Sequence, residues 1–172
     1  MRHLLPLLLT TFVLLPLNGF SATPVHNTSP PATVAVHTPA PKQIDAERLL
    51  TRYADALGRK DADAIAPLIS PSANVEVLWL DASPPKRFTL SATDYVQQLR
   101  ALWKFTRNDR HRFGPREWKA GSNGTLRVRL THNETRDLLG TPSGQENQLE
   151  LTLANTADGL RITHIMSSTK MW

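Results

Sequence analysis

The chain contains no cysteine among its 172 residues. This absence excludes disulfides, thiol nucleophiles, thiolate-bound metal centres and the lipid-modified cysteine that begins a mature lipoprotein. The sequence also lacks a G-x-S-x-G nucleophile motif and a glycine-rich phosphate-binding loop. Past residue 17, no segment is apolar enough to span a membrane.

The one strongly apolar run lies at the start of the chain, over residues 4–17, and follows Arg2 and His3. A run of this length falls short of the roughly 20 residues that a bilayer-spanning helix requires. Small residues then precede a polar segment, which is typical of a secretory signal peptide cleaved after Ser21. We predict a signal peptide over residues 1–21; a membrane anchor is the alternative. A secreted chain without cysteine fits a bacterial periplasm better than a disulfide-rich extracellular space.

A spacer and a single domain are expected after the signal peptide. Residues 22–41 contain five prolines and no Asp, Glu, Lys or Arg. This composition cannot bury enough apolar surface to offset its ordering entropy, so we interpret it as a disordered spacer. The remaining residues, 42–172, have the length of one domain.

Within that domain, helical spacing of apolar residues comes first and strand alternation follows. The pattern predicts helices over 44–57, 62–69 and 91–103, and strands over 74–80, 86–90, 106–119, 126–132, 149–153 and 160–166. We expect the strand over 106–119 to be broken at Gly114 and Pro115. Short turns between the later strands indicate an antiparallel sheet, and therefore an α+β two-layer domain in the order α-α-β-(β)-α-β-β-β-β.

This order resembles the nuclear transport factor 2-like superfamily, which includes SnoaL-like proteins and ketosteroid isomerases. Residues 52–75, from Arg52-Tyr53 to Ala73-Asn74-Val75, are similar to the opening helices and first strand of the isomerases. Residues 158–167 are similar to the closing strand of SnoaL-like members. The resemblance implies a cystatin-like cone, in which a curved, antiparallel-type sheet wraps around three helices and encloses an internal pocket.

The resemblance does not carry over the isomerase chemistry. Tyr53 matches the position of the tyrosine that binds the oxyanion in the family. The position of the catalytic base matches Val77, which cannot accept a proton. The second acid matches Glu150 most nearly, and strand alternation points Glu150 away from the core. Steroid isomerisation by that mechanism is therefore not expected.

Three side chains are candidates for catalysis or binding: Tyr53, His132 and His164. Both histidines continue the apolar face of a strand, so we expect both to point into the cone. Each has a structural alternative, as a buried, hydrogen-bonded core residue. The full set expected to line a ligand pocket is Tyr53, Val77, Trp79, Trp103, His132, His164 and Met166.

We expect no metal site and no cofactor. His111 has charged neighbours in its strand, and we recognise no histidine pair or third ligand at a usual metal spacing.

Residues 100–119 hold seven Lys or Arg and two acids, interleaved with aromatic residues. This pattern is typical of nucleic-acid binding, but the predicted export argues against a nucleic-acid partner and favours an anionic surface of the cell envelope. A solvated strand face is the simpler interpretation. Four arginines are expected on exposed strand faces, where they would contact a second subunit or prevent aggregation: Arg110, Arg112, Arg127 and Arg129.

Three functions remain open at this point. The first is a periplasmic protein that binds a small hydrophobic molecule in its internal pocket. The second is an isomerase, dehydratase or hydrolase that uses His132 or His164 as a base and Tyr53 as a donor. The third is a non-catalytic, dimeric interaction module that associates through its open sheet face.

Overall fold

The computed structural model describes residues 39–172. The expected signal peptide (1–21) and nearly all of the expected spacer (22–41) lie outside these residues. Over the part of the chain that is described, no helix combines the length and the apolar character needed to cross a membrane.

The helices occupy the predicted places. They are α1 (Gln43–Gly58), α2 (Ala62–Ile65), the short 3-10 helix η1 (Ala66–Leu68) and α3 (Ala92–Trp103). The side chain of Asp61 accepts a hydrogen bond from the backbone of Ala64, and Ser91 caps α3 in the same way. The chain takes its left-handed turn after α1 at Lys60, with φ +55°, and not at Gly58, which is the last helical residue.

Within residues 39–172, seven strands form one sheet. They are β1 (Ile69–Trp79), β2 (Lys86–Ser91), β3 (Thr106–Phe113), β4 (Glu117–Ala120), β5 (Leu126–Leu138), β6 (Thr141–Thr156) and β7 (Gly159–Met171). Their order is β2-β1-β7-β6-β5-β3, and β4 pairs with β5 beside β3. All neighbours are antiparallel except β1 and β7, which are parallel. The predicted break at Gly114 and Pro115 is confirmed as the gap between β3 and β4.

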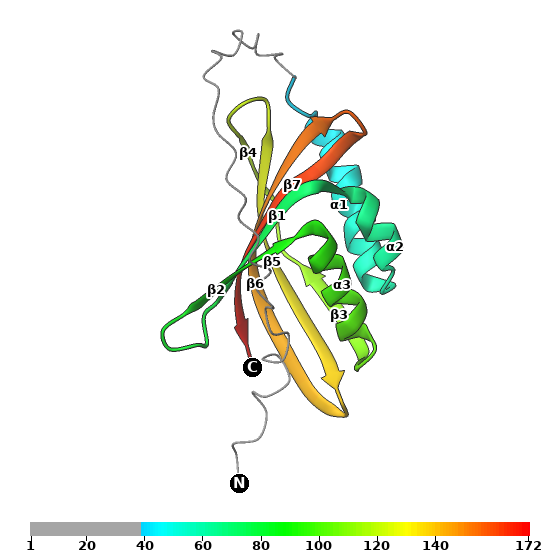
Figure 1. Ribbon diagram of the computed structural model, residues 1–172, viewed down its shortest axis with the longest axis vertical. Coiled ribbons are helices and arrows are strands. Elements are labelled where there is room, and N and C mark those ends of the chain that lie inside the picture. The colour runs from blue at the N-terminus through cyan, green and yellow to red at the C-terminus, as the bar shows by residue number, and fades with distance from the viewer. Residues whose placement is uncertain (1–38) are drawn as a thin grey trace, which may run out of the picture. The chain divides into compact units, whose positions relative to one another are not determined.

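The three α-helices lie on one face of this curved, unclosed sheet (Figure 1). The predicted α+β architecture is therefore confirmed. Leu49 and Ile65 of the helices are fully buried and belong to one core with the inward side chains of the sheet. The largest fully buried sheet residues in this core are Val75, Val128, Leu151, Leu153 and Ile162. Burial of these side chains is the main stabilising contribution that the sheet and helices share.

The inner face of the sheet changes from apolar to polar along β5. Val128 and Leu130 lie in the core, and the same alternation continues through His132, Glu134 and Arg136, which are 5–6% exposed. On β6, Leu151 and Leu149 give way to Asn147 in the same direction, since Asn147 pairs with His132. The apolar half is thus covered by the helices, and the polar half contains buried groups that need partners.

A bulge in β7 overturns the predicted orientation of His164. Ile162 pairs with Leu153 and His164 pairs with Thr152, which leaves Thr163 as an extra residue. The extra residue reverses the alternation, so that Ile165 is buried and His164 is half-buried on the outer face. His164 there lies 3.3 Å from the carboxylate of Glu76.

Met166 follows His164 to the outer face. It is half-buried and pairs in register with Glu76 on one side and Glu150 on the other. The prediction that it lines an internal pocket is therefore wrong for the same reason, because the bulge precedes it.

The charged residues of the outer face lie as expected. Glu150 points away from the core and pairs with Arg129 at 2.5 Å and with Arg127 at 3.5 Å. Arg110 and Arg112 are also exposed.

Candidate functional site

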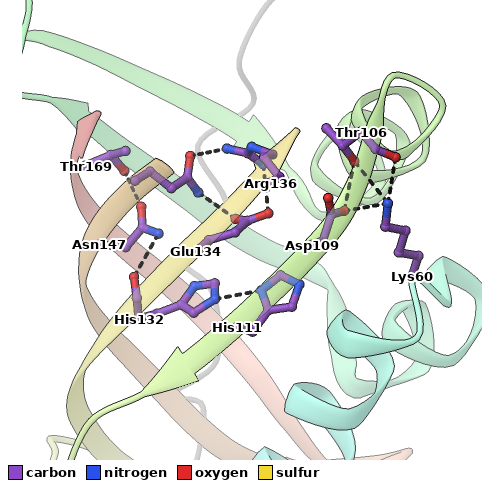
Figure 2. A network of polar contacts seen from close by, with 10 residues as sticks. Lys60, Thr106, Asp109, His111, His132, Glu134, Arg136, Asn147 and Thr169 are labelled. Atoms are coloured by element: carbon purple, nitrogen blue, oxygen red, sulfur yellow. Dashed lines mark hydrogen bonds and ion pairs between the residues drawn. The ribbon is translucent and has the colours of Figure 1, made fainter. Parts of the chain in front are cut away.

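Two histidines from neighbouring strands meet at the start of the polar half (Figure 2). Nδ1 of His111 lies 3.0 Å from Nε2 of His132, and Phe113 stacks on the His132 ring with centroids 4.5 Å apart. Burial, with smaller contributions from His111 and Arg136, lowers the pKa of His132 to about 4. Burial also lowers the pKa of His111. Both imidazoles are therefore neutral at neutral pH, and one donates its proton to the other.

A buried ion pair lies two residues further along β5. The guanidinium of Arg136 donates to Glu134 at 2.8 Å and to the side-chain oxygen of Gln145 at 2.7 Å, while Gln145 donates to the other Glu134 oxygen at 2.9 Å. The side chains of Arg136 and Glu134 are 3% and 6% exposed. Burial raises the pKa of Glu134, and Arg136 opposes this rise. The three side chains bond to one another, while Nε of Arg136 is buried without a partner.

Two tyrosine hydroxyls face the same region from the helices. Tyr53 of α1 and Tyr95 of α3 share a hydrogen bond of 2.6 Å between their hydroxyl oxygens. Burial raises the pKa of Tyr95 to about 12 and raises that of Tyr53 well above its usual value. The Glu134 carboxylate contributes to both rises, so both phenols stay protonated and remain hydrogen-bond donors. We refer to His111, His132, Glu134, Arg136, Gln145, Tyr53 and Tyr95 together as the inner polar cluster.

Supporting contacts hold the inner polar cluster from both sides. Asn147 donates to the backbone carbonyl of His132 at 3.2 Å and accepts from the hydroxyl of Thr169 at 2.8 Å. On β3, the carboxylate of Asp109 forms an ion pair with the ammonium of Lys60, with 2.6 Å between Oδ2 and Nζ (Figure 2). Buried atoms without a partner in this region include Oδ1 of Asp109, Nε2 of His111 and Nε of Arg136.

The space enclosed beside Tyr53 is small. Its volume is about 10 Å³, which is room for a single water, and its lining includes Phe113, Leu130 and Leu149. Arg116 closes one side and forms an ion pair with Glu47, which also accepts a hydrogen bond from the Trp118 indole at 2.8 Å. This cavity is therefore not the ligand-sized internal pocket that the sequence predicts.

A larger, open groove of about 490 Å³ lies at the far end of β5 and β6. Its lining consists of Asn108, Arg110, Thr135, Arg136, Asp137, Pro142, Ser143 and Trp172. Thr135 and Asp137 alternate along β5 with the inward-facing Glu134 and Arg136, and Arg110 pairs in register with Thr135. The groove therefore lies mainly on the outer face of the sheet and shares only Arg136 with the inner polar cluster.

The remaining predicted pocket residues lie on the inner side of the sheet but apart from the inner polar cluster. Val77 and Trp103 are partly buried and pack against the hydrophobic core. Trp79 is half-buried, pairs in register with Thr169, and leaves its indole nitrogen buried without a partner. Of the three catalytic candidates, the structure brings Tyr53 and His132 to one region and places His164 on the opposite face.

Sequence reasoning missed His111, Glu134 and Tyr95. The signal for Glu134 was available, because His132 and Glu134 are two residues apart on a strand and must share a face. His111 is recognisable only once β3 is known to pair with β5, with His111 opposite Glu134. Tyr95 lies on the predicted apolar stripe of its helix, and its partner Tyr53 is 42 residues away in the sequence.

Comparisons with known proteins bear on the fold alone. No protein-family profile and no curated protein sequence matches the chain. Among solved structures it is similar to the "Putative Scytalone Dehydratase" of Novosphingobium aromaticivorans, at 14% identity, with a TM-score of 0.62 and coverage of 76% of this chain and 85% of that one.

Two further structures carry the family name. One is an NTF2-like protein with a cystatin-like fold from N. aromaticivorans, at 17% identity, with a TM-score of 0.54 and coverage of 73% of this chain and 80% of that one. The other, from Streptomyces avermitilis, is called a "putative dehydratase from the NTF2-like family", at 14% identity, with a TM-score of 0.56 and coverage of 72% and 91%. The described domain thus has the cystatin-like fold of the nuclear transport factor 2-like proteins.

Proposed function

We propose that this domain is an acid–base enzyme of the dehydratase or isomerase type, acting on a small molecule that bears a carbonyl group. The observation that carries the proposal is the contact between His111 and His132, with 3.0 Å between their ring nitrogens, in the same region as the paired hydroxyls of Tyr53 and Tyr95. Similarity of fold to two proteins named as dehydratases supports the reaction class but does not establish it.

The chemistry needs a base, an oxyanion donor and an acid. An imidazole of the histidine pair would take a proton from the carbon next to a carbonyl, and a tyrosine hydroxyl would donate to the carbonyl oxygen as it becomes an enolate. The imidazolium would then return the proton to the neighbouring hydroxyl, which leaves as water while the carbon–carbon double bond forms. In an isomerisation the same proton returns to a different carbon.

The small internal cavity restricts where a substrate can bind. The apolar half of the inner face is filled by its own side chains, so a hydrophobic ligand does not fit the enclosed space beside Tyr53. The open groove has the volume of a small-molecule site, but it lies mainly on the outer face and meets the inner polar cluster only at Arg136. Its arginines and Asp137 favour a polar or anionic substrate over a purely hydrophobic one.

Proton exchange tests this proposal without knowledge of the natural substrate. We expect the protein to catalyse deuterium incorporation next to the carbonyl, or loss of water, for some member of a panel of small cyclic ketones and β-hydroxyketones in D₂O, followed by NMR. His111→Ala and Tyr53→Phe should each lower the rate by about 10²–10⁴-fold, the usual contribution of a general acid or base.

His164→Ala is the matched control, because this histidine lies on the outer face beside Glu76. It should leave the exchange rate unchanged. Exchange that is equally fast in His111→Ala and in the original protein, or absent for the whole panel, would count against the enzyme.

Export and self-association are proposals that the described residues leave open. The predicted signal peptide supports export to the periplasm, which fractionation and N-terminal sequencing of the processed chain would test.

The exposed arginines of the outer face support a homodimer through that face. The molecular mass measured by light scattering should then fall from that of a dimer to that of a monomer in Arg129→Glu. An original protein that is already monomeric would exclude the homodimer.

A further inference from the structure

Three side chains with metal-binding atoms converge in the inner polar cluster. His111 on β3 pairs in register with Glu134 on β5, and His132 lies two residues before Glu134 on the same face. Each offers one ligand atom, and these atoms all lie within 4.8 Å of one another. His132 and Glu134 are 6% and 5% exposed, so the strands and not the solvent hold their positions.

We propose that His111, His132 and Glu134 bind one divalent first-row transition metal ion, through Nδ1 of His111, Nε2 of His132 and a carboxylate oxygen of Glu134. Two imidazoles and one carboxylate suit zinc, cobalt, nickel or ferrous iron, whereas magnesium and calcium prefer oxygen ligands alone. The inference concerns ion binding only and does not rest on the proposed reaction.

The spacing of the two histidine nitrogens fits such an ion with little movement. Zinc binds imidazole nitrogen at about 2.0–2.1 Å, which separates two nitrogens by roughly 3.3 Å at a tetrahedral angle. The observed separation is 3.0 Å. A small outward rotation of either ring therefore admits an ion in place of the shared proton.

Glu134 keeps the capacity to act as a third ligand. Arg136 donates one hydrogen bond to one carboxylate oxygen, and Gln145 donates one to the other. Two carboxylate oxygens together accept about four hydrogen bonds or metal bonds, so a free position remains on each. The positive charges of Arg136 and Lys60 oppose a cation here, and the negative charges of Glu134 and Asp109 favour it.

The atoms without partners supply a second argument. When a metal takes Nδ1 of His111, the proton of that ring must lie on Nε2, which is buried and has no partner. Metal-bound histidines usually donate this proton to a carboxylate. Asp109 lies two residues away on β3, and its Oδ1 is also buried without a partner. Asp109 is therefore placed to accept this proton and to orient the His111 ring toward the ion.

Titration of the full chain tests the site. The protein is first dialysed against a chelator and then titrated with cobalt, followed by its visible absorption, and with zinc, followed by calorimetry. We expect one equivalent to bind with the intense absorption of four- or five-coordinate cobalt. His111→Ala should remove this step, Glu134→Gln should weaken it at least tenfold, and Asp109→Asn should weaken it by about 10–100-fold.

The chain has three further histidines before the described residues, and these could bind metal themselves. His164→Ala controls for the loss of any one imidazole and should leave the tight binding of one metal equivalent unchanged. Because His132→Ala removes a buried side chain and could unfold the domain, X-ray absorption of the zinc-loaded original protein replaces it as the second measurement. Two imidazole ligands in that spectrum support the site.

The proposal is overturned if His111→Ala, correctly folded by circular dichroism, binds the ion as tightly as the original protein, or if no tight step exists. These results leave the proposed reaction untouched, because ion binding is measured without substrate. Conversely, since the ion occupies the nitrogens that the acid–base step uses, added zinc should inhibit proton exchange. If the metal-free protein catalyses no exchange but still binds the ion when it is added, the reaction is rejected and the metal site is kept.

Discussion

Arg136→Ala is expected to lower the free energy of unfolding by about 3–5 kcal/mol, the usual cost of removing one partner of a buried ion pair. Arg136 and Glu134 are 2.8 Å apart with 3% and 6% of their side chains exposed. Removing the guanidinium leaves the buried Glu134 carboxylate with only Gln145 as a donor. Urea unfolding followed by circular dichroism measures the loss.

An outer-face arginine provides the matched control. Arg129→Ala breaks a 2.5 Å contact with Glu150, but the Arg129 side chain is 57% exposed, so a loss below about 1 kcal/mol is expected. Replacing both buried charges together, with Glu134→Leu and Arg136→Met, should cost less than Arg136→Ala alone. If Arg136→Ala and Arg129→Ala lower the free energy of unfolding equally, burial does not make the Arg136–Glu134 pair costly to break, and the prediction fails.

The stability of the domain should fall as the pH rises above about 10, the ordinary pKa of tyrosine. Burial raises the pKa of Tyr95 to about 12 in the folded protein and raises that of Tyr53 as well. A phenol that ionises more readily in the unfolded chain stabilises the fold below the unfolded pKa, and this stabilisation disappears as the pH approaches the folded value. Two pKa units at Tyr95 alone correspond to about 3 kcal/mol.

The chain contains only these two tyrosines, so the ultraviolet absorbance of phenolate reports on them alone. In the folded protein, we expect phenolate to form about two pH units later than in the chain unfolded by urea. Tyr95→Phe should reduce the pH dependence of stability by the share that Tyr95 contributes. A folded protein whose phenolate absorbance rises near pH 10 would mean that the hydroxyl pair is open to solvent.

The fold was accessible from sequence because its signals are local. The helical stripe of α1, the caps at Asp61 and Ser91, and the break before β4 each depend on residues within a few positions of one another. The parallel contact of β1 with β7 depends on residues about 90 positions apart, and the sequence analysis predicted no such pairing.

The site was accessible only in part, for two physical reasons. A single bulged residue, Thr163, reverses the faces of all later residues in β7, and strand alternation read from sequence cannot reveal a bulge. The approach of His111 to His132 depends on the pairing of β3 with β5, which no spacing in the sequence encodes. Tyr53 and His132 were recognised because each continues a periodic apolar face.

The position of β7 in the middle of the sheet has a consequence for the order of folding. The last of the described strands, β7, lies between β1 and β6 and pairs with both. Until β7 is in place, β1 and β2 form a two-stranded ribbon detached from β6, β5 and β3, and α1 lacks its contacts with β7. Such a ribbon is marginal in water. A growing chain therefore stays largely unfolded until β7 has been synthesised, and folding through these long-range contacts should be slow and cooperative.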